Sequence, residues 1–197
     1  MQVNIIEPNF KSPLPPWGEP IINYLRDRIL VSADQLNRLF WSKGSRKGKK
    51  KLYELSRYGY LLRYEIETSQ EHQIAYTLGP EGMKLTKRII PDLGIRKAQE
   101  ILIANKFIDA NGISDFNLWV GKTLLIGDVV IDGNKYALWC PIGEEVRTAS
   151  LNTEVGVSYA GLIVVAPTLK FVYDYNRKLK GFFSIYYTTQ NLLTEFL

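Results

Sequence analysis

The sequence has a single cysteine and a single histidine, and these scarcities limit the chemistry it can support. Cys140 has no second cysteine for a disulfide, and no cysteine-rich zinc site can assemble. His72 stands in a polar turn, and one histidine cannot build a multi-histidine metal centre. We therefore expect no metal, no cofactor and no catalytic residues. We interpret Cys140 as a packed thiol, because no cation or histidine adjoins it.

Long hydrophobic runs are also missing. The longest apolar stretch, near Ala160 to Ala166, is far too short to cross a bilayer, and residues 1–11 lack the pattern of a secretory signal. A composition of 46% hydrophobic and 12% aromatic residues is nevertheless enough for a packed core. We expect a soluble protein of the reducing cytoplasm, with no membrane partner.

Acidic residues are scarce in one part of the chain. Between Lys43 and Arg63 there are eight basic residues and one acid, Glu54, so this window has a net charge of +7. Because the whole chain has a net charge of +5, the remaining residues together are slightly negative. Positive charge confined to one patch is what a phosphate-binding surface requires, because each neutralised phosphate releases condensed counterions.

Prolines are concentrated at the beginning of the chain, where the sequence predicts an extended arm over residues 1–17. Glu19 and Pro20 suit the first turn of a helix whose apolar residues recur at helical spacing from Ile21 to Ile29.

A second short helix is expected after Ser32. This serine is the predicted N-cap, and Gln35 three residues later completes a capping box. Its apolar side consists of Leu36, Leu39 and Phe40.

A third helix is expected over residues 46–58, between Gly44 and the C-capping Gly59. Leu52 and Leu55 point toward the core, and cations with one tyrosine follow the opposite face at spacings of four, three and four. That stripe consists of Arg46, Lys50, Tyr53 and Arg57. We interpret it as a surface that enters a DNA major groove, with Lys47 and Lys49 beside it.

Two β-rich runs follow, Tyr60–Glu67 and Gln73–Leu78, and the polar residues between them predict a hairpin. Three helices followed by a hairpin is the order of the winged helix-turn-helix. Arg63 and Gln73 are the expected contacts of the wing. For Tyr60 and Tyr64 the sequence leaves phosphate contact and core packing equally open, and Ser45 is a further candidate phosphate contact.

After the hairpin, Pro80 opens an expected amphipathic helix through Met83, Leu85 and Ile89, and Pro91 with Gly94 indicates a domain boundary.

The second half has a different pattern. A helix over residues 96–110 precedes three β-rich stretches, 116–120, 124–131 and 135–139, with Asp132-Gly133-Asn134 as a tight turn. We expect Glu144 and Glu145 to begin a helix. Residues 162–166 form a strand buried on both faces, aromatic and polar residues alternate over 171–187, and Thr188 caps a short terminal helix. This order indicates a mixed sheet flanked by helices.

Three stretches, Ser32–Phe40, Lys51–Arg63 and Tyr76–Gly82, resemble the replication-relaxation family of plasmid and mobile-element proteins. They contain, in this order, a search helix, an L-x-x-L-x-x-x-G-L/Y-L recognition helix and a Y-x-L-x-x-x-G exit from the wing. The resemblance implies a winged-helix protein that acts on DNA in replication, mobilisation or transcription control.

Residues 127–140 resemble the β-hairpin of a restriction-endonuclease-like core, in which Asp128 matches the first metal-binding position. Trp139, Cys140 and Pro141 stand where that family has its second carboxylate and its lysine. The resemblance therefore implies a degenerate scaffold. From the residues alone, Asp128 and Asp132 are interpreted as turn-formers.

Taken together, the sequence predicts an α+β protein with an arm (1–17), a winged helix-turn-helix DNA-binding domain (18–92) and a smaller mixed α/β domain (95–197). This α/β domain resembles a degenerate restriction-endonuclease-like core and would serve dimerisation or partner docking. We expect a non-enzymatic homodimer that binds double-stranded DNA, with replication or mobilisation proteins as further partners. The expected DNA contacts are Arg46, Lys47, Lys49, Lys50, Tyr53, Arg57, Arg63 and Gln73.

Two alternatives stay open at this point. The second domain could act as a metal-dependent nuclease or nicking accessory through Asp128. The basic face of the winged helix could instead meet an acidic protein partner.

Overall fold

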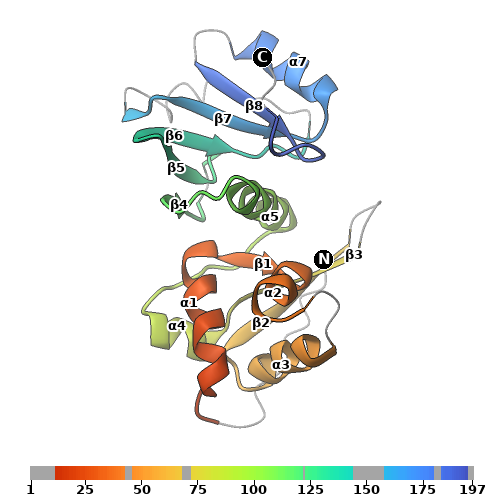
Figure 1. The fold of residues 1–197 in the computed structure, drawn as a ribbon, viewed down its shortest axis with the longest axis vertical. Helices are drawn as coiled ribbons and strands as arrows, with labels where there is room; N and C mark the ends of the chain where they lie inside the picture. Colours follow the sequence, from red (N-terminus) through yellow and green to blue (C-terminus); the bar gives the residue numbers. More distant parts are fainter. Residues whose placement is uncertain are drawn as a thin grey trace. The chain divides into compact units, whose positions relative to one another are not determined.

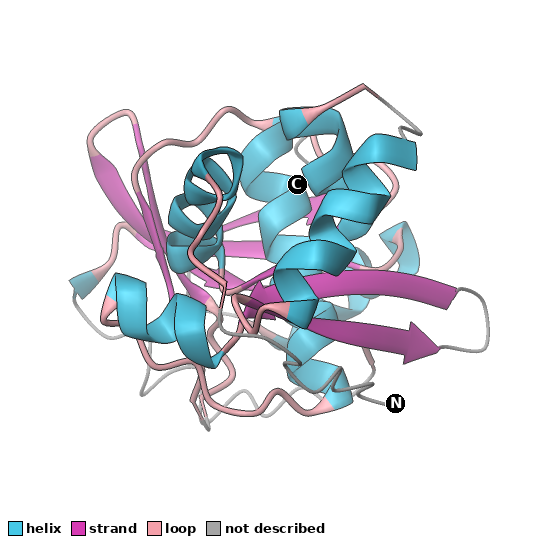
Figure 2. Cartoon of the chain, turned by 90° about the horizontal axis from the view of Figure 1, so that it is seen from below, coloured by secondary structure: helices cyan, strands magenta, loops and turns pink. Residues whose placement is uncertain are grey.

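A computed structural model describes residues 12–42, 46–67, 72–121, 123–143, 158–179 and 183–194. The chain divides into two compact units, Met1–Ile95 and Arg96–Leu197. Each unit combines helices with its own β-sheet, so the mixed α and β class expected from the sequence is confirmed. Figure 2 shows the helices and the strands of the chain in different colours. Within the described ranges, every helix is too short or too polar to span a lipid bilayer.

The first unit places three helices before a hairpin (Figure 1). A 3₁₀ turn, Pro16–Gly18, precedes the first helix. The helices and strands of this unit are, in chain order, α1 (Glu19–Arg28), β1 (Leu30–Ser32), α2 (Ala33–Phe40), α3 (Arg46–Arg57), β2 (Leu61–Glu67), β3 (His72–Leu78) and α4 (Pro80–Thr86). The three strands form one antiparallel sheet in the order β1-β3-β2.

Helix α1 begins where the sequence predicts, with Pro20 in its first turn, but it ends one residue early. Ile29, expected as the last apolar residue of this helix, has a positive φ of 65° and lies outside it. The buried Ile29 thus turns the chain into β1, a short strand that the sequence analysis did not anticipate.

Ser32 belongs to two elements at once. It ends β1, where it pairs with Ala75 of β3, and its hydroxyl accepts a hydrogen bond from the Gln35 amide at 3.2 Å. The predicted N-cap of α2 is therefore confirmed. Of the expected apolar side of α2, Leu36 is fully buried and Phe40 partly buried, whereas Leu39 is exposed, so the prediction was wrong for Leu39.

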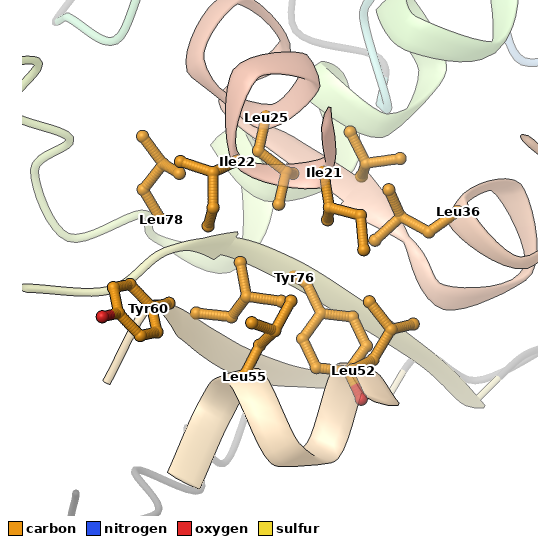
Figure 3. Close-up of a cluster of buried hydrophobic side chains, with 11 residues drawn as sticks. Ile21, Ile22, Leu25, Leu36, Leu52, Leu55, Tyr60, Tyr76 and Leu78 are labelled. Atoms are coloured by element: carbon orange, nitrogen blue, oxygen red, sulfur yellow. The ribbon is translucent and has the colours of Figure 1, made fainter. Parts of the chain in front are cut away.

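The core of the first unit lies between α1, α3 and the sheet. Figure 3 shows Leu52 and Leu55 of α3 pointing toward this cluster, with Ile21 and Leu25 of α1 on its other side. Leu61, Tyr76 and Leu78 of the hairpin belong to the same cluster. Burying such side chains contributes about 1.5–3 kcal/mol each, so this cluster fixes the rotation of α3 about its own axis.

The two β-rich runs pair as the expected hairpin: β2 and β3 are seven residues each and antiparallel, with Leu61 opposite Leu78. His72, expected in the turn, is instead the first residue of β3 and lies opposite Glu67. Helix α4 ends at Thr86, followed by Lys87 with a φ of 55°. The expected extension through Ile89 is wrong, because Ile89 lies beyond the helix and is 88% exposed.

The second unit contains a five-stranded sheet with two described helices. Its elements are α5 (Ile95–Ala110), β4 (Phe116–Leu118), β5 (Gly127–Ile131), β6 (Asn134–Trp139), β7 (Gly161–Ala166), α7 (Leu169–Lys178) and β8 (Ser184–Thr188). The strand order is β4-β5-β6-β7-β8, with antiparallel pairs up to β6 and parallel pairs from β6 to β8.

The two described helices of this unit pack on opposite faces of the sheet. Val172 and Tyr175 of α7 join a cluster with Trp139, whereas Phe107 of α5 contacts the Tyr187 ring at a centroid distance of 4.8 Å. Every residue of β7 is buried, as the sequence predicts for a strand covered on both faces. The tight turn at Asp132 is also confirmed, with positive φ at Asp132 and Gly133.

Two expectations for the second unit fail or lie outside the described residues. The sequence analysis assigns no element to the alternation over 171–187; its first part belongs to α7, where Val172 and Tyr175, with Leu179 just after the helix, recur at helical spacing. Thr188 caps no helix in the residues described up to Thr194, and its hydroxyl accepts from the Asn191 amide instead. The expected helix at Glu144 lies outside the described residues.

Candidate nucleic-acid interface

Both ends of helix α3 are fixed in place, the first by close packing against α2 and the second by a hydrogen-bonded C-cap. Gly48, in its first turn, is buried against Asn37 of α2 and Trp41 just after that helix, with no space for a side chain. At the other end Gly59 has a φ of 76°, and the amide of Tyr60 donates to the Leu55 carbonyl at 3.0 Å. That pattern is a Schellman C-cap, so the predicted role of Gly59 is confirmed.

The face of α3 opposite the buried leucines carries the predicted stripe. Tyr53 is 48% exposed, and all of the predicted cations on the helix are exposed: Arg46, Lys47, Lys49, Lys50 and Arg57. In the part of the chain that the structure describes, none of these five cations takes part in an ion pair. Their charge is therefore presented to solvent.

The position of several of these cations, in the first turn of α3, destabilises the helix. The first turn contains Arg46, Lys47 and Lys49 but no acidic residue. A helix N-terminus carries partial positive charge, so each cation there is unfavourable by about 0.3–1 kcal/mol. Helix stability therefore gives no reason for this placement.

Two other charges on α3 are engaged within the molecule. The carboxylate of Glu54, the one acid of the helix, accepts a hydrogen bond from the Tyr58 hydroxyl at 3.2 Å. The Lys51 ammonium lies 4.2 Å from the centre of the Trp17 ring, a cation–π contact. The second contact ties the end of the arm to α3, and sequence periodicity gives no signal for it.

The two predicted wing residues lie on opposite faces of the hairpin. Arg63 pairs across the strands with Tyr76, and Gln73 with Ile66, so their side chains alternate to different sides. Arg63 also forms an ion pair with Glu65 at 2.6 Å and is half-buried. The structure therefore does not bring Arg63 and Gln73 together, and Arg63 is not a free cation.

Of the two roles left open for Tyr60 and Tyr64, phosphate contact and core packing, the structure shows core packing. Tyr60 and Tyr64 are both buried, and burial raises the pKa of each hydroxyl. The Tyr60 hydroxyl donates to the Ser12 carbonyl at 2.8 Å, which holds the end of the arm against the first unit. Ser45 and the hairpin turn at residues 68–71 lie outside the described residues.

Sequence reasoning missed one exposed cation on the neighbouring helix α2. Arg38 is in the last turn of α2, the helix that contacts α3, and it forms no ion pair among the described residues. Its position, two residues after the buried Leu36, places it on the opposite side of α2. That helical spacing is the signal by which it could have been found.

In the second unit, Asp128 is a strand residue and not a turn-former as expected. It lies on β5, almost fully buried, and its carboxylate accepts from the Lys135 ammonium at 2.9 Å. This contact raises the pKa of Lys135. Trp139, Cys140 and Pro141 are all buried at the end of β6 and supply neither a carboxylate nor a cation. Within the described residues, no three metal-ligating side chains gather.

Cys140 is packed in the interior, as the sequence predicts. Burial raises the pKa of its thiol well above the usual value, and the nearby Glu100 carboxylate adds to this effect.

No family model and no curated protein matches this chain. Among solved structures, the chain is similar to protein VC1899 from Vibrio cholerae, with 14% identity and a TM-score of 0.33 over 89% of this chain. The chain spans 48% of the length of that protein. A likeness of this degree assigns no function.

Proposed function

We propose that the first unit is a winged helix-turn-helix that binds double-stranded DNA, with α3 as the helix that enters the major groove. The observation that carries this proposal is the set of exposed cations on α3 that form no ion pair in the described residues, with the exposed Tyr53 on the same face. The opposite face of this helix is held in the core by Leu52 and Leu55. A rigid helix with a basic outer face suits the dimensions of the major groove.

The cost of these cations to the helix supports the same conclusion. Arg46, Lys47 and Lys49 oppose the helix dipole and gain no ion pair in the described part of the chain. A polyanion would convert this unfavourable arrangement into a favourable one, because phosphates compensate the cations and release counterions when they bind.

In this proposal the contacts come from Arg46, Lys47, Lys49, Lys50, Tyr53 and Arg57, with Arg38 added from α2. Arg63 is a positioning residue, because its guanidinium is held by Glu65. Gln73 contributes only if DNA reaches the face of the hairpin turned away from Arg63.

We further propose that the protein acts without catalysis, in replication, mobilisation or transcription control of a plasmid, phage or other mobile element. The support is the resemblance of the first unit to the replication-relaxation family. The second unit, whose residues 127–140 resemble the hairpin of a restriction-endonuclease-like core, would then serve dimerisation or docking of a replication or mobilisation protein. In this unit the carboxylate of Asp128 already forms an ion pair with the ammonium group of Lys135.

The experiment is a salt titration of duplex binding with Lys50→Ala/Arg57→Ala. We expect a loss of affinity on the order of tenfold to a hundredfold and a salt slope shallower by about 2. Lys84→Ala/Lys106→Ala is the control, since it removes two exposed cations elsewhere. Equal affinity of the two double variants would refute the proposal. If an acidic protein were the true ligand, generic DNA would fail to compete for it at physiological salt.

A further inference from the structure

Helix α7 of the second unit repeats the stripe of α3. In α3, Lys50, Tyr53 and Arg57 follow one another at spacings of three and four, and in α7 Lys170, Tyr173 and Arg177 do the same. Both triplets consist of a lysine, a tyrosine and an arginine in the same order.

The second triplet also lies on the outer side of its helix. Val172 and Tyr175 of α7, with Leu179 just after the helix, pack the inner side of α7 against the five-stranded sheet. Lys170 and Arg177 are exposed, and Tyr173 is 58% exposed. At about 100° per residue these three side chains share one face, opposite the buried ones.

The charges of this stripe have no partner in the described part of the chain. Neither Lys170 nor Arg177 forms an ion pair there. Arg177 lies in the last turn, where a cation stabilises the helix through its dipole, but Lys170 lies in the first turn, where a cation is unfavourable. Helix stability therefore explains Arg177 and leaves Lys170 unexplained.

We propose that the outer face of α7 is a second surface for the phosphate backbone of double-stranded DNA, formed by Lys170, Tyr173 and Arg177. The occupant follows from charge complementarity, since two unpaired cations flank a tyrosine whose hydroxyl can donate to a phosphate oxygen. This inference rests on the proposed function, because it assigns the same ligand to a second surface. It makes the second unit a part of the DNA-binding protein.

The test compares three double variants of the full chain by fluorescence anisotropy with a labelled duplex across a salt series. They are Lys170→Ala/Arg177→Ala on α7, Lys50→Ala/Arg57→Ala on α3 and the control Lys84→Ala/Lys106→Ala. We expect the α7 variant to bind about tenfold more weakly than the control, with a salt slope shallower by about 2, because each lost phosphate contact removes about 0.9 from the slope. The charge-conserving Lys170→Arg/Arg177→Lys should restore both values.

The outcomes separate this inference from the proposed function. If the α3 variant loses affinity while the α7 variant equals the control, the inference is overturned and the proposed function stands. If neither differs from the control, both fall. If the α7 variant keeps its salt slope but loses self-association in sedimentation, the face is a protein-docking surface and the inference is again overturned. Thermal unfolding of each variant verifies that these exposed substitutions leave the fold intact.

Discussion

Gly48 of α3 packs directly against Asn37 of α2, and a Cβ atom at position 48 would overlap the Asn37 Oδ1 atom. The ring of Trp41 closes the same space, with Cε3 2.7 Å from that Cβ position. The close approach of α2 and α3 therefore requires glycine, and the orientation of the basic face depends on it.

Gly48→Ala should destabilise the first unit. In most helices this change stabilises by about 1 kcal/mol, but here the added methyl group forces α2 and α3 apart at a cost of about 1–3 kcal/mol. We expect a net loss on the order of 1 kcal/mol in urea unfolding and weaker duplex binding. Gly94→Ala is the control, because nothing lies within 4 Å of its added Cβ. A more stable Gly48→Ala protein would show that the two helices are not in close contact.

Lys47→Glu should stabilise the protein and weaken its DNA binding. The change replaces an exposed, unpaired cation in the first turn of α3 with an acid that the helix dipole favours. We expect the free energy of unfolding to rise by about 0.5–1 kcal/mol at low salt, while duplex affinity falls at least about tenfold. Lys47→Gln should lie between the two. Opposite signs for stability and affinity are the diagnostic result, and parallel changes would contradict the assignment.

The Asp128–Lys135 ion pair should make the second unit sensitive to alkaline pH. The pKa of Lys135 is raised above its ordinary value, first by its hydrogen bond to Asp128 and then by the charge of that carboxylate. A cation with a raised pKa contributes stability at neutral pH, and this contribution is lost as the pH rises through the raised value. Thermal unfolding of the wild type and Lys135→Arg should therefore diverge above about pH 10.5, with the arginine variant retaining its Tm. Identical pH profiles would show that the pair adds nothing.

The thiol of Cys140 should be inert in the native protein. It is buried and its pKa is raised well above the usual value, so almost no thiolate forms at neutral pH. An aromatic disulfide reagent should react orders of magnitude more slowly than with a free cysteine, and fully once urea unfolds the chain. Because this is the one cysteine, its reaction rate reports the opening of the second unit alone. Rapid native reaction would place the thiol at the surface.

Sequence periodicity predicted those elements that have a strong local signal. The leucines of α3 and the capping residues Ser32 and Gly59 each act over a few residues, so their roles were readable without the fold. The turn at Asp132 was readable for the same reason. The exposed face of α3 follows from the same spacing, and that prediction covered most of the candidate interface.

What the sequence did not reveal depends on distant partners. The strand β1 has only three residues, and its pairing with β3 defines it. The ion pair of Arg63 with Glu65 and the contact of Lys51 with Trp17 are also set by tertiary geometry, so charge counting overestimated how many cations are free. Helix α7 was missed because its exposed aromatic residues hid the spacing of Val172, Tyr175 and Leu179.

Because Ser32 both pairs with Ala75 and caps α2, the sheet and the helix share one residue. A separation of β1 from β3 would release the serine hydroxyl and expose the amide of Gln35 to solvent. The Gln35 amide and the amides that pair β1 with β3 should therefore exchange their hydrogens at one common rate. Exchange in the first turn of α2 then reports the separation of β1 from β3.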